Sequence, residues 1–220
     1  MGKEFSCTVR IDGVAAPGKL HLDSHALRIA GSRRLTVALS DVTRAAVLDD
    51  TLRLKAKGML IELDLGASRA QTWRAAIVSP KTLLEKLGVR PAERVYVKDL
   101  SEDGFVRDLA HTVTTPPSGV LRGTFDVAFL GIADPSALNA VGRVIAHLIP
   151  AGALWIVYPK GKASPVPDAA VRAAAREHGL YDAKVVAFSA THTATKWMFP
   201  LAARAALLTR SARPSRSSAR

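Results

Sequence analysis

The first third of the chain alternates between apolar and polar residues over short segments that turn residues interrupt. The pattern runs from about residue 5 to residue 66, and the pairs Asp12-Gly13 and Pro17-Gly18 break its first segments. It is clearest between residues 51 and 65, where the alternation continues on both sides of a central glycine. Because the side chains of a strand point alternately to its two faces, this pattern predicts antiparallel strands with one buried and one solvated face.

After this region the spacing of the apolar residues changes to that of a helix. The residues at helical spacing are Ala70, Trp73, Ala76 and Ile77. They predict a short amphipathic helix that ends before Ser79-Pro80. Strands followed by one helix with a large aromatic side chain are typical of a small open β-barrel, and we expect Trp73 to fill the open end.

From residue 79 onward, predicted strands and helices alternate. A helix is expected to begin with Ser79 as its N-cap and to end at Gly88. Strands are then predicted at residues 94–97, 125–130, 153–158, 183–190 and 195–199, and helices at 134–148 and 167–179. Nearly continuous apolar strands between capped helices predict an α/β domain with a mostly parallel sheet covered on both faces.

These patterns divide the chain into three predicted parts. Residues 1–78 are expected to form the β-barrel domain with its C-terminal capping helix, and residues 79–203 the three-layer α/β domain. Residues 204–220 contain five arginines and no carboxylate. We expect this last part to be a disordered basic tail, which either makes transient contact with nucleic acid or an anionic surface or simply keeps the protein soluble.

Composition narrows the class of protein without identifying its activity. The chain has 220 residues, of which 48% are hydrophobic and 23% charged, with a net charge of +12. This is the composition of a globular protein, and a single cysteine cannot form an internal disulfide. No apolar stretch approaches the roughly 20 residues that span a bilayer, so we expect a cytoplasmic protein.

The first predicted domain resembles a known family at its final helix. Residues 71–77, which include Trp73, are similar to the last helix of a pleckstrin-homology-like or GRAM-like domain, and the resemblance covers about residues 4–78. In that family, basic residues around the first hairpin loop bind phosphoinositides. Here residues 11–19 contain only Lys19 as a basic residue, so lipid binding is not predicted.

The second predicted domain resembles the class I methyltransferase fold, a Rossmann-like arrangement, over residues 79–200. Residues 125–130, with Asp126 near their start, look like the fourth strand of that family, and residues 149–156 look like the turn into its fifth strand. Residues 177–180 look like the helix end before the sixth strand. More narrowly, residues 87–91 and 152–160 are similar to a bacterial family of unknown function whose members resemble shortened methyltransferase domains.

Two departures from that family concern its cofactor, S-adenosylmethionine. The family binds it over a glycine-rich turn after the first strand, whereas residues 98–104 here contain one glycine and three carboxylates. The family also places an acidic residue at the end of its second strand, and residues 111–117 contain none. We therefore expect the usual cofactor site to be absent and no cofactor to be bound.

The carboxyl ends of the predicted strands remain the expected place for a ligand. The candidate residues there are Asp99, Ser101, Gly104, Asp134, Lys160 and Lys162, with Gly131 beside them. No catalytic constellation or metal-ligand spacing is recognised. The sequence thus favours a non-catalytic protein that binds a protein or a small anion at this edge. Two alternatives are a methyltransferase with an altered S-adenosylmethionine site and a protein that associates with nucleic acid through the basic tail.

Overall fold

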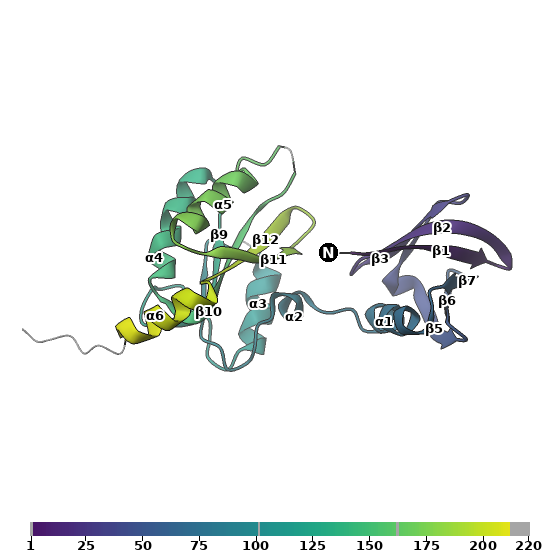
Figure 1. Ribbon diagram of the computed structural model, residues 1–220, viewed down its shortest axis with the longest axis horizontal. Coiled ribbons are helices and arrows are strands. Elements are labelled where there is room, and N and C mark those ends of the chain that lie inside the picture. The colour runs from purple at the N-terminus through teal and green to yellow at the C-terminus, as the bar shows by residue number, and fades with distance from the viewer. Residues whose placement is uncertain (1, 101, 162, 212–220) are drawn as a thin grey trace, which may run out of the picture. The chain divides into compact units, whose positions relative to one another are not determined.

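The computed structural model describes residues 2–100, 102–161 and 163–211 (Figure 1). Contacts between Cα atoms divide the chain into an N-terminal unit, residues 1–82, and a C-terminal unit, residues 83–220. Among the described residues, no helix is both long and apolar enough to cross a membrane.

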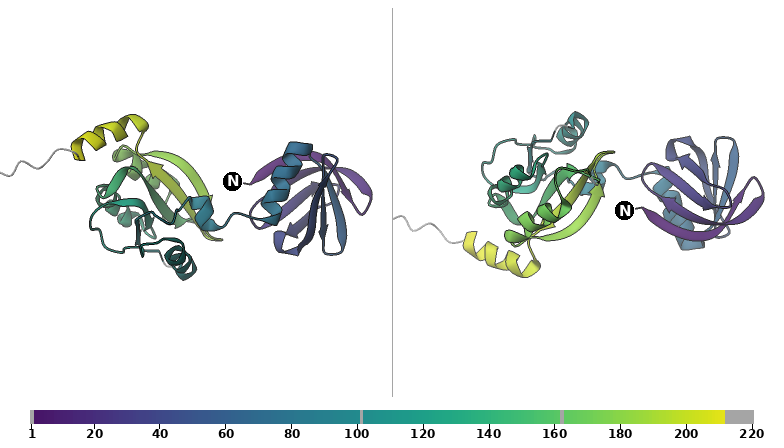
Figure 2. Two further views of the ribbon diagram at one scale, coloured as in Figure 1. Left: turned by 90° about the horizontal axis from the view of Figure 1, so that it is seen from below. Right: turned by 90° about the horizontal axis from the view of Figure 1, so that it is seen from above.

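The described part of the N-terminal unit is one curled antiparallel sheet with one α-helix (Figure 2). Its strands hydrogen-bond in the order β4-β3-β2-β1-β7-β6-β5. They are β1 (Lys3–Ile11), β2 (Val14–Leu22), β3 (Ala26–Gly31), β4 (Leu35–Ala38), β5 (Val42–Leu48), β6 (Thr51–Ala56) and β7 (Met59–Asp64), with the short 3-10 helix η1 (Leu39–Asp41) between β4 and β5. The predicted antiparallel strands are confirmed.

Two of the tight turns follow from residues that accept a left-handed backbone. Asp12 and Gly13 have φ values of 49° and 87°, and Lys57 and Gly58 have values of 51° and 78°. Positive φ at both central residues is the geometry of the two-residue hairpin turn. The predicted break at Pro17-Gly18 is wrong, because both residues lie inside β2. A Cβ on Gly18 would lie 2.8 Å from Val9 Cγ2, so this glycine permits a close approach within the sheet instead of making a turn.

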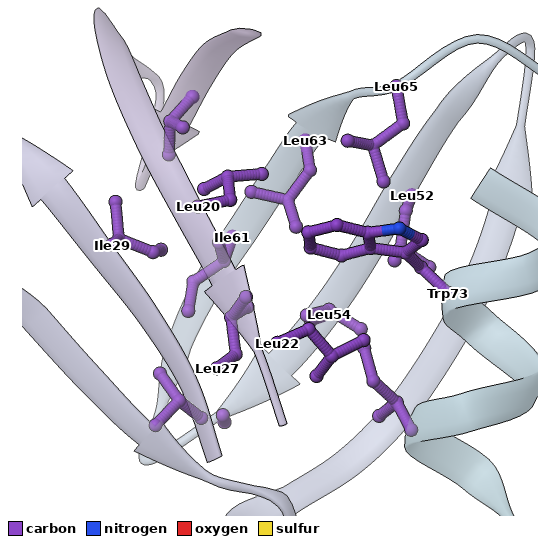
Figure 3. Close-up of a cluster of buried hydrophobic side chains, with 14 of the residues drawn as sticks. Leu20, Leu22, Leu27, Ile29, Leu52, Leu54, Ile61, Leu63, Leu65 and Trp73 are labelled. Carbon is purple, nitrogen blue, oxygen red and sulfur yellow. The ribbon is translucent and has the colours of Figure 1, made fainter. Parts of the chain in front are cut away.

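The helix α1 (Ala67–Val78) packs against β5 and β6 and supplies the central side chain of the core. Trp73 is 2% exposed, and Figure 3 shows its indole ring beside Leu63, Leu65 and Leu52. The predicted helix and the burial of Trp73 are confirmed. Burying so large an aromatic side chain stabilises the unit by about 3–5 kcal/mol relative to alanine.

The C-terminal unit contains a five-stranded mixed sheet of order β11-β12-β10-β9-β8. The first three strands in sequence, β8 (Val95–Lys98), β9 (Phe125–Gly131) and β10 (Leu148–Pro159), are parallel. The last two, β11 (Tyr181–Ala187) and β12 (His192–Met198), form a hairpin whose second strand pairs antiparallel with β10. The predicted α/β domain is confirmed, with parallel pairing limited to three strands.

Helices cover this sheet on both faces (Figure 1). On one face α2 (Leu83–Leu87) and α3 (Asp103–Thr112) pack around Trp155 and Phe129. On the other face α4 (Val141–Ile145) and α5 (Asp168–Glu177) pack around Trp197, and the 3-10 helix η2 (Pro135–Ala140) precedes α4. Trp155 and Trp197 are both 0% exposed, so each lies in the core on its own face of the sheet.

Two predicted helix boundaries, one at the junction of the units and one in the C-terminal unit, are wrong. Ser79 does not begin a helix, because its N–H donates to the carbonyl of Ala75 and so closes α1; the next helix begins at Leu83. The helix expected to reach Leu148 ends at Ile145, because Leu148 pairs with Phe125 as the first residue of β10.

The basic tail also differs from its prediction where it is described. Helix α6 runs from Leu201 to Ser211, so the disorder expected from residue 204 is wrong as far as residue 211. Residues 201–208 are leucine and alanine at seven of eight positions, and both residue types favour a helix over a disordered chain. Residues 212–220 lie outside the described residues.

Candidate functional site

The carboxyl ends of β8, β9 and β10 meet at one edge of the C-terminal sheet, because the three strands are adjacent and parallel. This edge carries the loop after Lys98, the loop after Gly131 and the loop after Pro159. The three loops that carry the candidate residues therefore begin at the same edge of the sheet. Ser101 and Lys162, two of the candidates, lie outside the described residues.

The turn after β8 lies directly against the end of β9. Asp99 has a φ of 54°, and a Cβ on Gly131 would lie 1.9 Å from the Asp99 carbonyl oxygen. Only glycine at position 131 allows that approach, because any side chain would displace the turn. The sequence lacks a glycine-rich turn after β8, and the backbone of that turn occupies the space beside Gly131 on the neighbouring strand.

The side chains of this turn are acidic and open to solvent. The Asp99 carboxylate is exposed and lies 4.0 Å from the ammonium group of Lys98. Glu102 is the residue before α3 and is half-buried. Gly104 lies in the first turn of α3, where a Cβ would meet open space, so nothing in its surroundings requires glycine.

The candidate residue Asp134 has a structural role at the start of η2. Its Oδ1 accepts a hydrogen bond of 2.8 Å from the backbone N–H of Ser136, which makes it the N-cap of η2. The two hydrogen bonds from Ser136 lower the pKa of this carboxyl group, so it is ionised at neutral pH. The carboxylate therefore serves the loop after β9.

Lys160 does not pair with either aspartate of the edge. Its ammonium group donates to the Ser189 carbonyl oxygen at 2.9 Å, and its backbone N–H donates to the carbonyl of Thr191. Both contacts tie the end of β10 to the turn between β11 and β12. Gly161 follows with a φ of 105°, a conformation that favours glycine.

A histidine that the sequence did not suggest lies at the same edge. Residues 191–193 look like a polar loop in the sequence, but His192 is the first residue of β12 and pairs with Pro159. Its Nδ1 lies 3.5 Å from Glu102 Oε1 and 3.0 Å from Thr191 Oγ1. Both hydrogen-bond contacts of its ring use Nδ1, and among the described residues none forms a hydrogen bond with Nε2. The sequence did not suggest this residue because its position depends on the pairing of β12. That strand runs antiparallel to β10, so its first residue lies beside the carboxyl ends of the parallel strands.

A cleft of about 400 Å³ lies beside this edge, between the loop after β10 and the hairpin β11–β12. On its floor the Tyr158 hydroxyl donates to Asp168, and Arg172 bridges Asp168 and Asp182. Burial raises the pKa of Tyr158, and the Asp168 carboxylate raises it further. The hydrogen bond from Arg172, with that from Tyr158, lowers the pKa of Asp168. The floor is thus a closed network with a neutral phenol and an ionised carboxylate.

Among solved structures, this chain is similar to several methyltransferases. One is magnesium protoporphyrin IX methyltransferase from Synechocystis PCC 6803 with bound SAM, at 10% identity, 54% coverage of this chain, 74% of that chain and a TM-score of 0.37. Another is a putative methyltransferase from Thermoplasma acidophilum, at 10% identity, coverages of 89% and 97%, and a TM-score of 0.42. A third is CalO1, a methyltransferase in calicheamicin biosynthesis in its SAH-bound form, at 14% identity, coverages of 60% and 57%, and a TM-score of 0.37. No family model and no curated protein matches the sequence.

These comparisons contradict two expectations drawn from the sequence. The expectation of a non-catalytic binding protein is wrong, since the similar structures are methyltransferases and favour the methyltransferase alternative. The expectation that no cofactor is bound is wrong on the same ground, because two of those structures hold SAM or SAH. Both expectations rested on the missing glycines after β8 and on the missing acidic residue at the end of the second strand. Gly131 permits a close backbone contact between the turn after β8 and the end of β9. At identities of 10–14% the likeness concerns the fold, so the functional argument rests on the residues of this chain.

Proposed function

We propose that the C-terminal unit is an S-adenosylmethionine-dependent methyltransferase with an altered cofactor site at the carboxyl edge of its sheet. The observation that carries the proposal is the contact between Gly131 and the Asp99 carbonyl, which holds the turn after β8 tightly over the end of β9. Ligands of open α/β sheets bind at this position.

The charge of the edge also suits this cofactor. S-adenosylmethionine carries a sulfonium and an ammonium group against one carboxylate, so it is a net cation at neutral pH. The turn presents the carboxylates of Asp99, Glu102 and Asp103, and the carboxylates of Asp99 and Glu102 can also accept hydrogen bonds from ribose hydroxyls. When bound, the cofactor supplies an electrophilic methyl group.

The alteration concerns the place of the second strand. In the class I methyltransferase family that this unit resembles, an acidic residue lies at the end of the second strand. Here Ser118 lies alongside β8 instead, where Val97 donates its N–H to the Ser118 carbonyl and Ser118 donates to the carbonyl of Val95. Ser118 brings no carboxylate, so we assign the ribose contact to the turn after β8.

Calorimetric titration of the full chain with S-adenosylmethionine and with its demethylated product tests this proposal. We expect micromolar binding of at least one of them. Gly131→Ala should abolish the binding, because its Cβ displaces the Asp99 carbonyl, whereas Gly104→Ala should bind normally, because its Cβ meets open space. Absence of heat with both compounds for the folded wild-type chain would refute the proposal, as would equal binding by the two variants.

We further infer that the N-terminal unit is a pleckstrin-homology-like barrel capped by α1. The support is the curled sheet of seven strands and the burial of Trp73 beneath the helix. Lys19 lies within β2 and pairs with Glu4 at 3.0 Å, so it belongs to the sheet and not to the first hairpin turn. Membership in the bacterial family of shortened methyltransferase domains, a cytoplasmic location and contacts of the tail stay predictions.

A further inference from the structure

Two lysines on neighbouring strands of the C-terminal sheet lie directly opposite each other. In the pairing of the strands, Trp155 of β10 is opposite Lys196 of β12, and Lys196 is opposite Lys184 of β11. Residues opposite each other in antiparallel strands share one face, and like charges in such a pair destabilise the sheet. The sheet therefore carries a local repulsion that a bound anion would relieve.

The surroundings of Lys196 strengthen the repulsion. The Lys196 ammonium lies 5.8 Å from the centre of the Trp155 ring, and its electrostatic neighbours are Lys184, Glu93, Arg90 and Arg204. Burial lowers the pKa of Lys196, and the charge of Lys184 lowers it further. The carboxylate in this group, Glu93, already accepts a hydrogen bond from the backbone of Arg90 and forms an ion pair with its guanidinium.

The two lysines have no carboxylate of their own. Among the described residues, neither Lys184 nor Lys196 forms an ion pair, and Lys184 donates instead to the carbonyl of Lys86 at 2.6 Å. Arg204 likewise donates to a carbonyl, that of Phe199, at 2.8 Å. Carbonyl contacts leave the positive charges uncompensated, so the cluster keeps its affinity for an anion.

An aromatic side chain lies in the next row of the same face. Tyr181 is opposite Met198, and Met198 is two residues after Lys196, so the side chains of Tyr181, Met198 and Lys196 point to one side of the sheet. Tyr181 is 43% exposed. An exposed ring beside several cations is the combination that binds single-stranded nucleic acids, in which bases stack and phosphates are neutralised.

We propose that this surface, defined by Tyr181, Lys184, Lys196, Arg90 and Arg204, binds a single-stranded nucleic acid, with phosphates at the lysines and a base stacked on Tyr181. A free phosphate ion would use the cations alone and leave the exposed ring without a role. The surface is separate from the proposed cofactor edge, because Lys196 lies toward the end of β12 whereas His192 at its start lies at that edge. The inference therefore stands independently of the methyltransferase proposal.

Fluorescence anisotropy with a labelled oligouridylate, performed on the full chain, tests the lysines. In Lys184→Gln/Lys196→Met we expect at least tenfold weaker binding. The dependence of log affinity on log salt should become shallower by about 1.4, since each lost phosphate contact on a single strand removes about 0.7. Lys184→Gln alone, at an exposed position, should give a smaller loss in the same direction and keeps the test available if the double variant does not fold.

The chain contains a matched control for these lysines. Arg44 of β5 and Lys55 of β6 are also directly opposite each other, and both are exposed on the N-terminal unit. Arg44→Gln/Lys55→Gln removes the same number of charges, and we expect less than a twofold change in affinity. If this control weakens binding as much as the double variant does, the effect reflects net charge and the proposed surface is wrong.

The aromatic contribution has its own test. Tyr181→Leu keeps an apolar side chain but removes the ring, and we expect about tenfold weaker binding with an unchanged salt dependence. Wild-type affinity in both Tyr181→Leu and Lys184→Gln/Lys196→Met would overturn the proposal. So would binding of the wild-type chain to phosphatidylserine vesicles without binding to the oligouridylate, because that result would assign the surface to a membrane.

Discussion

The sheets of the two units bury their side chains differently. In β6 of the N-terminal unit, buried and exposed residues alternate along the strand, so one face meets the core and the other meets water. In β9 of the C-terminal unit, six of seven residues are buried, because helices cover both faces. A strand buried on both faces carries few polar side chains, and the one in β9, Asp126, lies near the start of the strand and pairs with Arg94. The exposed polar groups of the parallel strands are therefore found at their ends, which is where the candidate cofactor site lies.

The largest expected effect is a loss of stability in one unit alone, caused by removing the large aromatic side chain of the N-terminal core. Trp73→Ala is expected to destabilise the N-terminal unit by about 3–5 kcal/mol, because the indole is almost completely buried in its single core. The C-terminal unit, which has its own two clusters, should be unaffected. Thermal unfolding followed by calorimetry should show one shifted transition and one unchanged transition.

The control for this experiment lies on the same helix. Val78 is 59% exposed, so Val78→Ala should change the stability by less than about 0.5 kcal/mol. If Trp73→Ala shifts both transitions equally, the two units do not have independent cores.

Acid should affect the N-terminal unit through the turn between β2 and β3. Burial opposes ionisation of Asp23, but hydrogen bonds from the backbone of His25, from Arg28 and from the backbone of Ala26 outweigh it and lower the pKa to about 2. The resulting stability, about 2 kcal/mol, is fully present above the ordinary pKa near 4 and is lost as the pH falls through about 2.

The measurement compares Asp23→Asn with the wild-type chain in denaturant titrations at several pH values. We expect the variant to be less stable by about 2 kcal/mol at neutral pH, with the difference shrinking below pH of about 4 and vanishing near pH 2. A difference that is the same at neutral and acidic pH would show that the charge of Asp23 contributes nothing.

The smallest expected effect is a difference in stability between two tryptophan variants, one on each face of the C-terminal sheet. Trp197 Nε1 donates to Thr195 Oγ1 at 2.9 Å, whereas Trp155 Nε1 is buried with no hydrogen-bond partner among the described residues. Trp197→Phe loses a hydrogen bond and Trp155→Phe removes an unsatisfied donor. We therefore expect Trp197→Phe to cost about 1 kcal/mol more, as measured from the midpoints of denaturant unfolding. Equal costs would mean that packing alone decides both positions.

Local chemistry explains which predictions of the fold were accurate. The turn at Lys57-Gly58 depends on backbone preferences of two adjacent residues, and the burial of Trp73 depends on helical spacing, so both could be predicted from the sequence. Ser79 shows the limit of such rules. It has the residue type of an N-cap, but the hydrogen bond it forms with Ala75 belongs to the preceding helix. A capping residue flanked by helices on both sides does not by itself indicate which of them it caps.

The sequence by itself determined the alternation of the first sheet, the buried strands of the second and the positions of several turns, because these depend on neighbours within a few residues. Only the tertiary structure decided that Gly131 admits the turn at Asp99, that His192 lies beside Glu102 and that Lys184 is opposite Lys196. The first two contacts join residues that are far apart in the chain, and the third depends on the register of a hairpin. Their geometry depends on strand order and register, which the pattern of single residues does not encode.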